Sequence, residues 1–177
     1  MATTIQNFFS RAAEKQFARD FLFRVKQINV EGVSFDGDSD LVYARSAQLP
    51  GRNIENKTVN YYGQTFNVPG KSTYPGSEAY SIEFFHDENN ELRTKFEAAS
   101  RAVFNNETST GQYGLPGDGD LITLDVINKE LVPIQTIQLV GASIRDINAI
   151  DYSIADGTGE ILNTTVTFSY HFYRDFS

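Results

Sequence analysis

Hydrophobic and polar side chains alternate along most of this 177-residue chain. Apolar residues at every second position indicate half-buried strands, because successive side chains of a strand point to opposite faces of the sheet. The pattern predicts strands at about residues 21–26, 41–47, 58–62, 65–68, 80–85, 122–127, 133–147 and 162–172. The last is the clearest, with Leu162, Val166, Phe168, Tyr170 and Phe172 on one side and Asn163, Thr165, Thr167, Ser169 and His171 on the other.

Residues 89–104 instead follow a helical period, with Leu92, Phe96, Ala99 and Val103 on one stripe. In two places a Glu is followed four residues later by a cation, at Glu91–Lys95 and Glu97–Arg101. This order is the more stabilising one on the exposed side of a helix. Asp87 and Glu88 precede the first turn, where the helix dipole favours negative charge. We therefore predict one amphipathic helix over 89–104.

Turn residues divide the strands. The runs at 58–62 and 65–68, on either side of Gly63-Gln64, predict an extended β-hairpin over 58–68. Pro69-Gly70 and Pro75-Gly76 then bracket a predicted loop. Gly141 inside the long run at 133–147 predicts a bulge or bend. Residues 1–20 are expected to form a short helix or an arm that orders on contact with another molecule. The prediction is a mainly β protein, an antiparallel sandwich or barrel flanked by one helix, in a single domain spanning 1–177.

Composition narrows the function. The chain carries 14 Phe and 9 Tyr but no Trp, which favours strands. Its net charge of −8 argues against wrapping DNA with a basic face. The absence of Cys excludes disulfides, thiol catalysis and Cys-ligated zinc. We find no apolar run of signal-peptide or membrane-span length and expect the protein in the cytosol, or in something assembled there.

No pattern of catalytic or metal-binding residues stands out. His86 and His171 each end a strand and have neither a ligand spacing nor a nucleophile motif. Asp36, Asp38 and Asp40 resemble the start of a calcium loop, which Leu41 and Ala47 then break. The glycine-rich stretch 111–120 lacks the ending of a phosphate-binding loop and is expected to be a connector. Paired carboxylates for sugar hydrolysis could come from Glu78, Glu83, Asp87 and Glu88. That mechanism requires a particular distance between the two carboxylates, which the sequence does not determine. We expect no enzyme, metal or cofactor.

The block from Ala79 to Phe104 resembles the strand-into-helix element of tail tube proteins from contractile-tailed bacteriophages. Those proteins have an apolar strand, an acidic Asp-Glu-Asn turn and a helix that opens with Leu-Arg and a Phe, here Leu92-Arg93 and Phe96. The Leu49-Pro50-Gly51 turn, the Tyr62-Gly63 hairpin, the Phe17-to-Phe23 start and the closing Val166-to-Tyr170 run follow in the family's order. The loops 36–40 and 111–120 do not match it.

The resemblance implies hexameric rings that stack into a hollow tube inside a contractile sheath, an architecture shared with the inner tube of type VI secretion systems. The implied partners are further copies of the chain, the sheath protein, a baseplate initiator, a tail terminator, and a tape measure protein or genomic DNA in the lumen. The implied location is the virion tail, assembled in the host cytoplasm without a membrane. Inter-ring contacts are expected from Phe8, Phe9, Val59, Tyr61, Tyr62 and Phe66, and ring-edge or docking contacts from Phe172, Tyr173 and Phe176.

Two alternatives stay open at this point. A baseplate protein of the same fold that initiates the tube would share the whole pattern. A soluble carbohydrate-binding or hydrolytic β-sandwich would instead be a monomer with a concave aromatic and acidic patch. A melting curve measured with added sugars would detect the second alternative.

Overall fold

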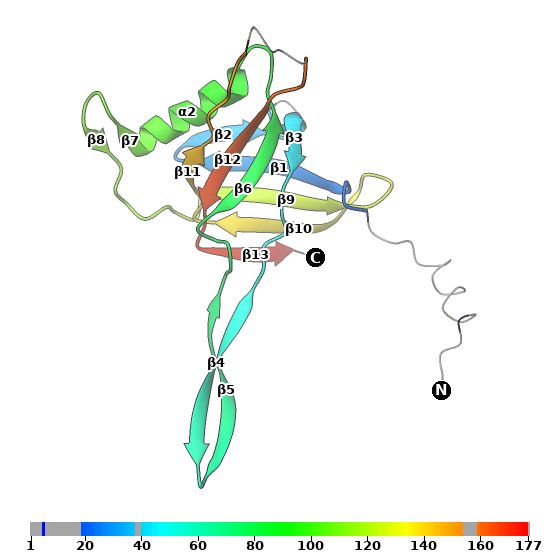
Figure 1. Cartoon of the computed structure of the whole chain (residues 1–177), viewed down its shortest axis with the longest axis vertical. Coiled ribbons are helices and arrows are strands. Elements are labelled where there is room, and N and C mark those ends of the chain that lie inside the picture. The colour runs from blue at the N-terminus through cyan, green and yellow to red at the C-terminus, as the bar shows by residue number, and fades with distance from the viewer. Residues whose placement is uncertain (1–4, 6–18, 38–39, 154–158, 177) are drawn as a thin grey trace.

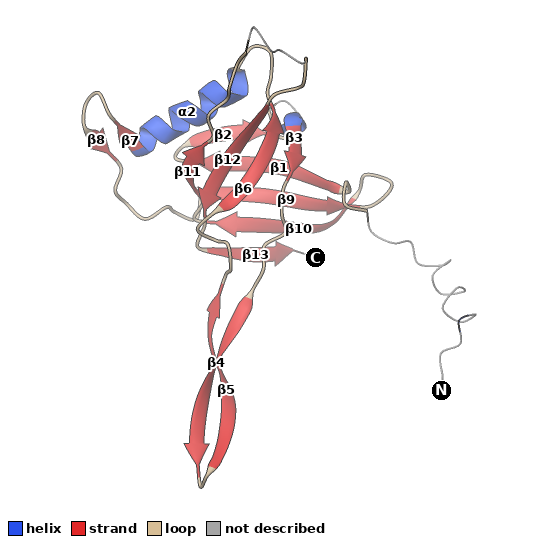
Figure 2. Ribbon diagram, in the orientation of Figure 1, coloured by secondary structure: helices blue, strands red, loops and turns tan. Residues whose placement is uncertain are grey.

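The computed structural model describes Ile5 and residues 19–37, 40–153 and 159–176. The described chain forms two packed β-sheets, a flanking helix and a long hairpin that extends away from both sheets (Figures 1 and 2). A mainly antiparallel β-sandwich with one flanking helix, as predicted, is therefore confirmed for this part of the chain. Phe8, Phe9 and nearly all of the predicted arm at 1–20 lie outside the described residues.

The larger sheet has five antiparallel strands. Their spatial order is β13 (Phe172–Phe176), β10 (Pro133–Val140), β9 (Leu121–Ile127), β1 (Phe23–Val30) and β2 (Val33–Asp36). A bulge between Val25 and Gln27 breaks the alternation predicted for residues 21–26. Phe21, predicted as part of that strand, precedes β1 and is 69% exposed.

The smaller sheet has four antiparallel strands in the order β11 (Ser143–Ile147), β12 (Asn163–Ser169), β6 (Tyr80–Phe85) and β3 (Ala44–Ser46). The strand predicted at 41–47 is only partly correct, because Leu41–Tyr43 forms a short 3-10 turn, η1, before β3. The turn buries Leu41 against the core. Two further short strands, β7 (Phe104–Asn105) and β8 (Thr110–Gly111), pair beyond the helix and were not predicted.

The helix α2 (Glu91–Val103) closes the sandwich and confirms the predicted stripe. Phe96 is fully buried, and its ring centroid lies 4.3 Å from Phe35 on β2, 5.3 Å from Phe84 on β6 and 6.1 Å from Phe168 on β12. One helical residue thus packs against strands of both sheets. Such an aromatic cluster holds the two layers together.

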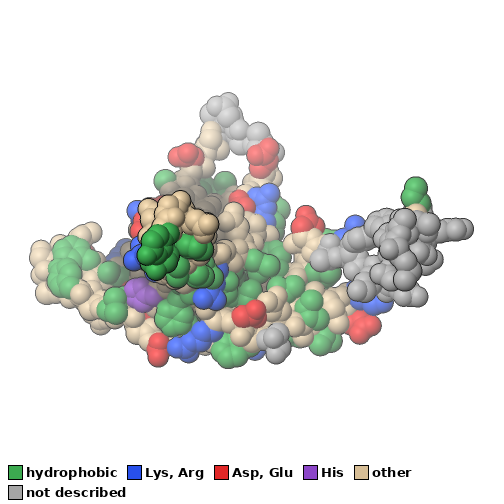
Figure 3. Space-filling view, turned by 90° about the horizontal axis from the view of Figure 1, so that it is seen from below, with side chains coloured by type: hydrophobic (Ala, Val, Ile, Leu, Met, Phe, Trp, Pro, Cys, Tyr) green, Lys and Arg blue, Asp and Glu red, His purple; other side chains and the backbone are tan. Residues whose placement is uncertain are grey.

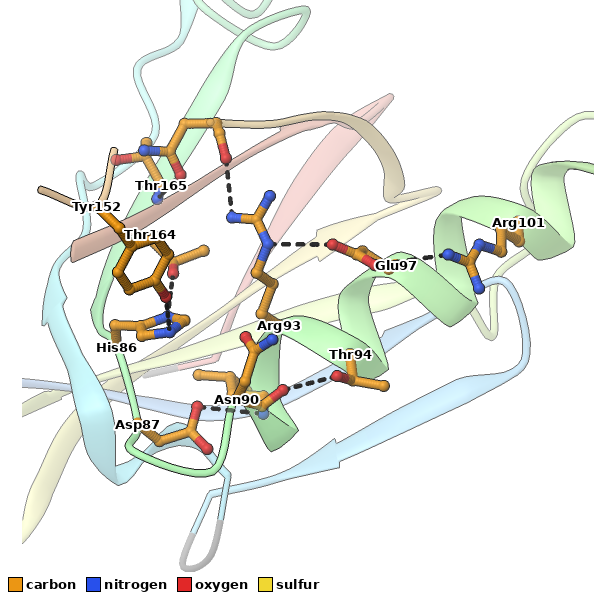
Figure 4. Close-up of polar contacts among 12 residues, drawn as sticks. His86, Asp87, Asn90, Arg93, Thr94, Glu97, Arg101, Tyr152, Thr164 and Thr165 are labelled. Atoms are coloured by element: carbon orange, nitrogen blue, oxygen red, sulfur yellow. Dashed lines mark hydrogen bonds and ion pairs between the residues drawn. The ribbon is translucent and has the colours of Figure 1, made fainter. Parts of the chain in front are cut away.

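Polar contacts hold α2 at its first turn and along its exposed side. The Asp87 carboxylate accepts hydrogen bonds from the backbone N–H groups of Glu91 at 2.7 Å and Leu92 at 3.4 Å, which satisfies donors that the helix leaves open (Figure 4). The predicted Glu97–Arg101 pair is present at 3.6 Å. The predicted Glu91–Lys95 pair is wrong, because Lys95 forms its ion pair with Asp40 in the loop after β2.

The chain crosses between the sheets at two places where the sequence predicted continuous strands. Gly141, at φ +68°, ends β10, and the chain re-enters the other sheet as β11, so the predicted strand 133–147 is two strands. The predicted strand 162–172 likewise stops at Ser169, and Phe172 begins β13 in the five-stranded sheet. The two crossings lie together, because the His171 N–H donates to the Val140 carbonyl at 2.9 Å.

Candidate functional site

The most conspicuous feature outside the sandwich is the hairpin of β4 (Asn53–Tyr61) and β5 (Gln64–Thr73). These strands form a sheet of their own, and all their residues are exposed except the half-buried Thr73 at the base (Figure 1). The hairpin is longer than the predicted 58–68. Pro69-Gly70, predicted as a loop, lies inside β5, where a register shift between Ile54 and Asn56 accommodates the extra residue.

The tip of the hairpin is a two-residue turn. Tyr62 at φ 48° and Gly63 at φ 77° are its central residues, the positive-φ pair that a tight hairpin turn requires. The turn therefore lies one residue earlier than the predicted Gly63-Gln64. Tyr62 is 88% exposed, and its ring meets that of Tyr61 edge to face at 4.6 Å.

The two faces of the hairpin differ in chemistry. The register pairs Val59 with Phe66, Lys57 with Val68 and Tyr61 with Gln64. Val59, Tyr61, Phe66 and Val68 therefore share one face, which also carries the polar Lys57 and Gln64 at its two ends. We name these four residues the hairpin apolar face. The opposite face carries only amides and hydroxyls over the same length, from Thr58, Asn60, Thr65 and Asn67. In Figure 3 the hairpin points at the viewer, with hydrophobic side chains on one side and other residues on the opposite side.

An apolar face of this kind, exposed on an isolated hairpin, indicates a binding surface. Val59, Phe66 and Val68 remain 50%, 49% and 46% exposed. A two-stranded hairpin by itself is at best marginally stable in water, and it gains stability when one face packs against another surface. Contiguous exposed apolar side chains mark protein interaction sites. Three of the predicted inter-ring residues, Val59, Tyr61 and Phe66, thus share this face, while Tyr62 lies at the tip.

The predicted docking residues at the C-terminus lie on β13, which pairs with β10. Tyr173 packs against the core, and its ring meets Tyr74 edge to face at 5.5 Å. Phe172 is half-buried, whereas Phe176 is 52% exposed. The aromatic C-terminal segment therefore packs largely on its own molecule, and Phe176 is the most exposed of the three predicted docking residues.

Each sheet also has two unpaired edges within the described chain. The edges of the four-stranded sheet are β3 and β11, and those of the five-stranded sheet are β2 and β13. Because neighbours alternate in direction, the outer strands of a four-stranded sheet run antiparallel to each other and those of a five-stranded sheet run parallel. Unpaired edges are templates for strand addition.

Each of the two histidines takes part in contacts that join separate segments of the chain. Nδ1 of His86 lies 3.1 Å from the Thr164 hydroxyl, and Nε2 lies 3.0 Å from the Tyr152 hydroxyl (Figure 4). The His86 side chain thereby connects β12 to the segment after β11. His171 lies in the crossing between the sheets. Within the described residues, no three His, Asp or Glu side chains gather where they could hold a metal ion.

The loops that resembled ligand sites are held by local polar contacts. Asp40 accepts a hydrogen bond from the Asp36 N–H at 3.2 Å in addition to the ion pair with Lys95. Asp120, at the end of the glycine-rich loop, accepts from the Gly117 N–H at 2.9 Å and the Glu31 N–H at 3.1 Å. These carboxylates therefore stabilise turns. In the described part of the chain, no helix has both the length and the apolar character needed to cross a membrane.

Comparison with known proteins places the fold. No protein-family model matches this sequence. No curated protein matches it either. Among solved structures, a chain in the anti-feeding prophage tube-terminating cap aligns with a TM-score of 0.61 at 11% identity, covering 92% of this chain and 93% of that one. A chain in the anti-feeding prophage baseplate aligns with a TM-score of 0.58 at 14% identity, covering 92% and 95%.

A third chain, from the sheath-tube complex of an extracellular contractile injection system in its extended state, aligns with a TM-score of 0.51 at 13% identity. The alignment covers 95% of this chain and 97% of that one. All three similarities extend over nearly the whole length of both chains. The protein therefore shares its fold with chains found in contractile injection systems.

Proposed function

We propose that this protein is the tail tube subunit of a contractile-tailed bacteriophage. Copies form hexameric rings, and the rings stack into a hollow tube through which the genome leaves the virion. The observation that carries the proposal is the hairpin apolar face, a binding surface on an element that projects from the sandwich. The similarity to chains of contractile injection systems supports a structural role in such an assembly.

The hairpin supplies the contact between rings. It projects from one end of the sandwich in Figure 1, and in stacked rings the next copy would meet it with a different surface. Such head-to-tail contacts generate open polymers, whereas a self-complementary contact would stop at a dimer. Stacked rings accordingly need a surface like this one, and its apolar side chains become buried only on assembly.

Edge pairing supplies the contact within a ring. Joining β3 of one copy to β11 of the next continues the four-stranded sheet with antiparallel pairing, since these edges run in opposite directions. Arg45 on β3 and Asp146 on β11 are both exposed and bring opposite charges to this joint. Joining β2 to β13 would require parallel pairing, which is slightly less stable.

The wider partners follow from the tube. A sheath surrounds it, a baseplate initiator and a terminator bind its ends, and a tape measure protein or DNA occupies the lumen. The net charge of −8 suits a channel for DNA, because like charges suppress adhesion of phosphates. In this assembly the tube subunit has a structural role and catalyses no reaction. The sheath supplies the motion during contraction.

A second candidate is a baseplate protein that initiates the tube. The similarity to a chain in a baseplate structure favours it specifically. An initiator would attach to the tube through one end and to the baseplate through the other. It would therefore form rings that do not extend into long tubes by themselves.

Substitutions on the two hairpin faces test the proposal. Val59→Thr combined with Phe66→Thr keeps strand-forming residues but removes the apolar contact. Asn60→Ser combined with Thr65→Ser changes the opposite face as the matched control. We expect the first pair to abolish sedimentable assemblies and the second to preserve them. Both should change the unfolding free energy of the subunit by less than about 0.5 kcal/mol, as for other surface substitutions.

The measurement is the pelleted fraction in sedimentation, with electron microscopy of the pellet. Full assembly by the Val59→Thr, Phe66→Thr variant would contradict the role given to the hairpin. A thermal melt of each variant separates loss of assembly from loss of folding.

A further inference from the structure

Two legs join the hairpin to the sandwich, residues 47–52 before β4 and residues 74–79 after β5. Within the described chain, β4 and β5 pair only with each other, so the legs alone determine where the hairpin points (Figure 1). Segments with few anchoring contacts are free to move. A hairpin on two unanchored legs would swing, and its apolar face would meet a partner in many directions. The contacts of the legs therefore determine how far the hairpin can move.

The leg before β4 is tied to the four-stranded sheet. Tyr80, the first residue of β6, is 5% exposed, and its hydroxyl donates a hydrogen bond to the Gln48 carbonyl at 2.5 Å. Ala47, the preceding residue of the leg, packs against the core. At the other end of the leg, Nε of Arg52 donates to the Ser72 hydroxyl on β5 at 3.0 Å. This leg is therefore held both at the sandwich and at the base of the hairpin.

The leg after β5 is tied to the five-stranded sheet. Tyr74 is half-buried against the core, and its ring meets that of Tyr173 on β13 edge to face at 5.5 Å. The Ser77 N–H donates to the Tyr74 carbonyl at 3.1 Å, which folds this leg into a tight turn. The Ser77 carbonyl in turn accepts a hydrogen bond from the Tyr170 N–H at 2.9 Å. This second leg thus has both an aromatic and a backbone anchor.

Tyr170 connects the anchors of the two legs. It lies in the crossing between β12 and β13, is 5% exposed, and its ring meets that of Tyr80 edge to face at 5.8 Å. Burial and, to a smaller extent, the nearby phenols of Tyr173 and Tyr74 raise the pKa of Tyr170, because these side chains lie close together. Edge-to-face aromatic pairs have a preferred geometry and stabilise beyond the burial of their area. The four tyrosines therefore form one cluster that contacts both legs and both sheets.

We propose that Tyr74, Tyr80, Tyr170 and Tyr173, which we name the tyrosine clamp, fix the direction of the hairpin relative to the sandwich. The consequence for assembly rests on the proposed function: the clamp presents the hairpin apolar face to the next copy in one orientation. Ordering a mobile element on binding costs free energy, and a surface that is already ordered avoids that cost. The four tyrosines are positioning residues, because they act through the hairpin and lie away from its apolar face.

Two spin labels on one subunit measure the direction of the hairpin, and the chain has no native Cys to compete for them. One label is attached at Asn60→Cys, on the polar face of the hairpin, and the other at Ser34→Cys, an exposed position of β2. The distance between the labels is measured at a protein concentration at which sedimentation detects only single subunits. The width of the distance distribution reports how far the hairpin swings.

With the clamp intact, we expect one narrow distribution. Tyr80→Phe removes only the hydrogen bond to Gln48, and Tyr74→Ala removes one ring of the cluster. Each should widen the distribution, and the two combined should widen it several-fold. Tyr74→Phe keeps the ring and should keep the narrow width. Tyr113→Ala, at an 81% exposed tyrosine outside the clamp, is the matched control and should also leave the width unchanged.

A broad distribution with the clamp intact, or an unchanged width in the folded double variant, would overturn the inference. Equal widening by Tyr113→Ala would overturn it as well, because the effect would not be specific to the clamp. Thermal melts show which variants fold. If Tyr74→Ala does not fold, Tyr80→Phe decides: a wider distribution supports the clamp and an unchanged one overturns it.

A second measurement tests the consequence for assembly. The Tyr74→Ala, Tyr80→Phe variant keeps the whole hairpin apolar face, so it should still assemble, but only at a several-fold higher concentration than the unmodified protein. The pelleted fraction in sedimentation measures that concentration. Equal concentration dependence despite a wider distance distribution would overturn the role of the clamp in assembly. Unmodified protein that never assembles would contradict the proposed function instead, and the distance measurements would still test the clamp.

Discussion

Single residues explain how the strands of this protein are locked in place, and Asp125 shows it most clearly. Asp125 is 1% exposed on the central strand β9, where its carboxylate accepts hydrogen bonds from Arg24 and Thr136, both at 2.7 Å. Asp125 belongs to the strand predicted at residues 122–127, whose alternation with Ile122, Leu124 and Val126 predicts only a polar, outward position for it. Burial could not be predicted because it depends on β1 and β10, whose side chains cover Asp125 from both sides and are distant in sequence.

The environment of Asp125 gives a pH-dependent stability. Burial acts to raise the pKa of Asp125, but the hydrogen bonds from Arg24 and Thr136 and the positive charge of Lys26 outweigh it, so the pKa is lowered. A lowered folded-state pKa stabilises the fold at pH values above the unfolded-state pKa of about 4, and this contribution is lost as pH falls through the folded-state pKa.

Asp125→Asn should therefore reduce the unfolding free energy near pH 7 by about 1–3 kcal/mol, the cost of disturbing a buried charged hydrogen bond. The difference from the unmodified protein should shrink as the pH falls below about 4. Urea unfolding at pH 7 and in acid measures both values. A difference that does not depend on pH would argue against an ionised, stabilising Asp125.

Gly141 is the second residue whose role depends on its backbone. A Cβ at this position would lie 2.1 Å from the His171 ring, and the φ of +68° disfavours any other residue. Gly141→Ala should cost about 1–2 kcal/mol for the left-handed backbone and roughly 1–3 kcal/mol more for the crowded ring.

Gly114→Ala is the matched control, because a Cβ there meets no atom within 4 Å. It should change the melting temperature little, whereas Gly141→Ala should lower it clearly. Equal melting temperatures for the two variants would show that the crossing at Gly141 tolerates a side chain.

Elements were predicted unequally well. The 3.6-residue stripe of α2 and the alternation of β6 and β12 are local signals, and the sequence alone located all three. A bend was predicted at Gly141, but the change of sheet there and the crossing after Ser169 were not, because a chain that changes sheets can keep its alternation of apolar residues. The hairpin was found from its turn residues, but its length was underestimated because Pro69-Gly70 normally marks a loop.

The edge strands give a prediction at this scale. Arg45→Glu alone and Asp146→Arg alone each place like charges at the proposed joint between β3 and β11, so each should reduce ring formation several-fold. The double variant restores opposite charges and should recover a large part of it. Ring formation is counted in electron micrographs at equal protein concentration. A double variant no better than the worse single variant would argue against this joint.

At the scale of the whole molecule, pattern and resemblance predicted a mainly β fold with one helix and a projecting hairpin. They did not predict which side chains share a face of the hairpin, because that requires the register between β4 and β5. Only that register shows that the candidate residues Val59, Tyr61 and Phe66 lie on one face of the hairpin together with Val68. The predicted contacts of Phe8 and Phe9 stay predictions.

Assembly is the central claim, and negative-stain electron microscopy of the purified protein at increasing concentration tests it most directly. Assembly through an exposed apolar hairpin should depend on concentration, with subunits at low and rings or hollow tubes at high concentration. Long tubes formed without a baseplate component would favour the tube subunit, and rings that never extend would favour the initiator. If tubes appear only after baseplate extract is added, assembly requires an initiator. A dispersed monomer at every concentration, with and without that extract, would contradict the account.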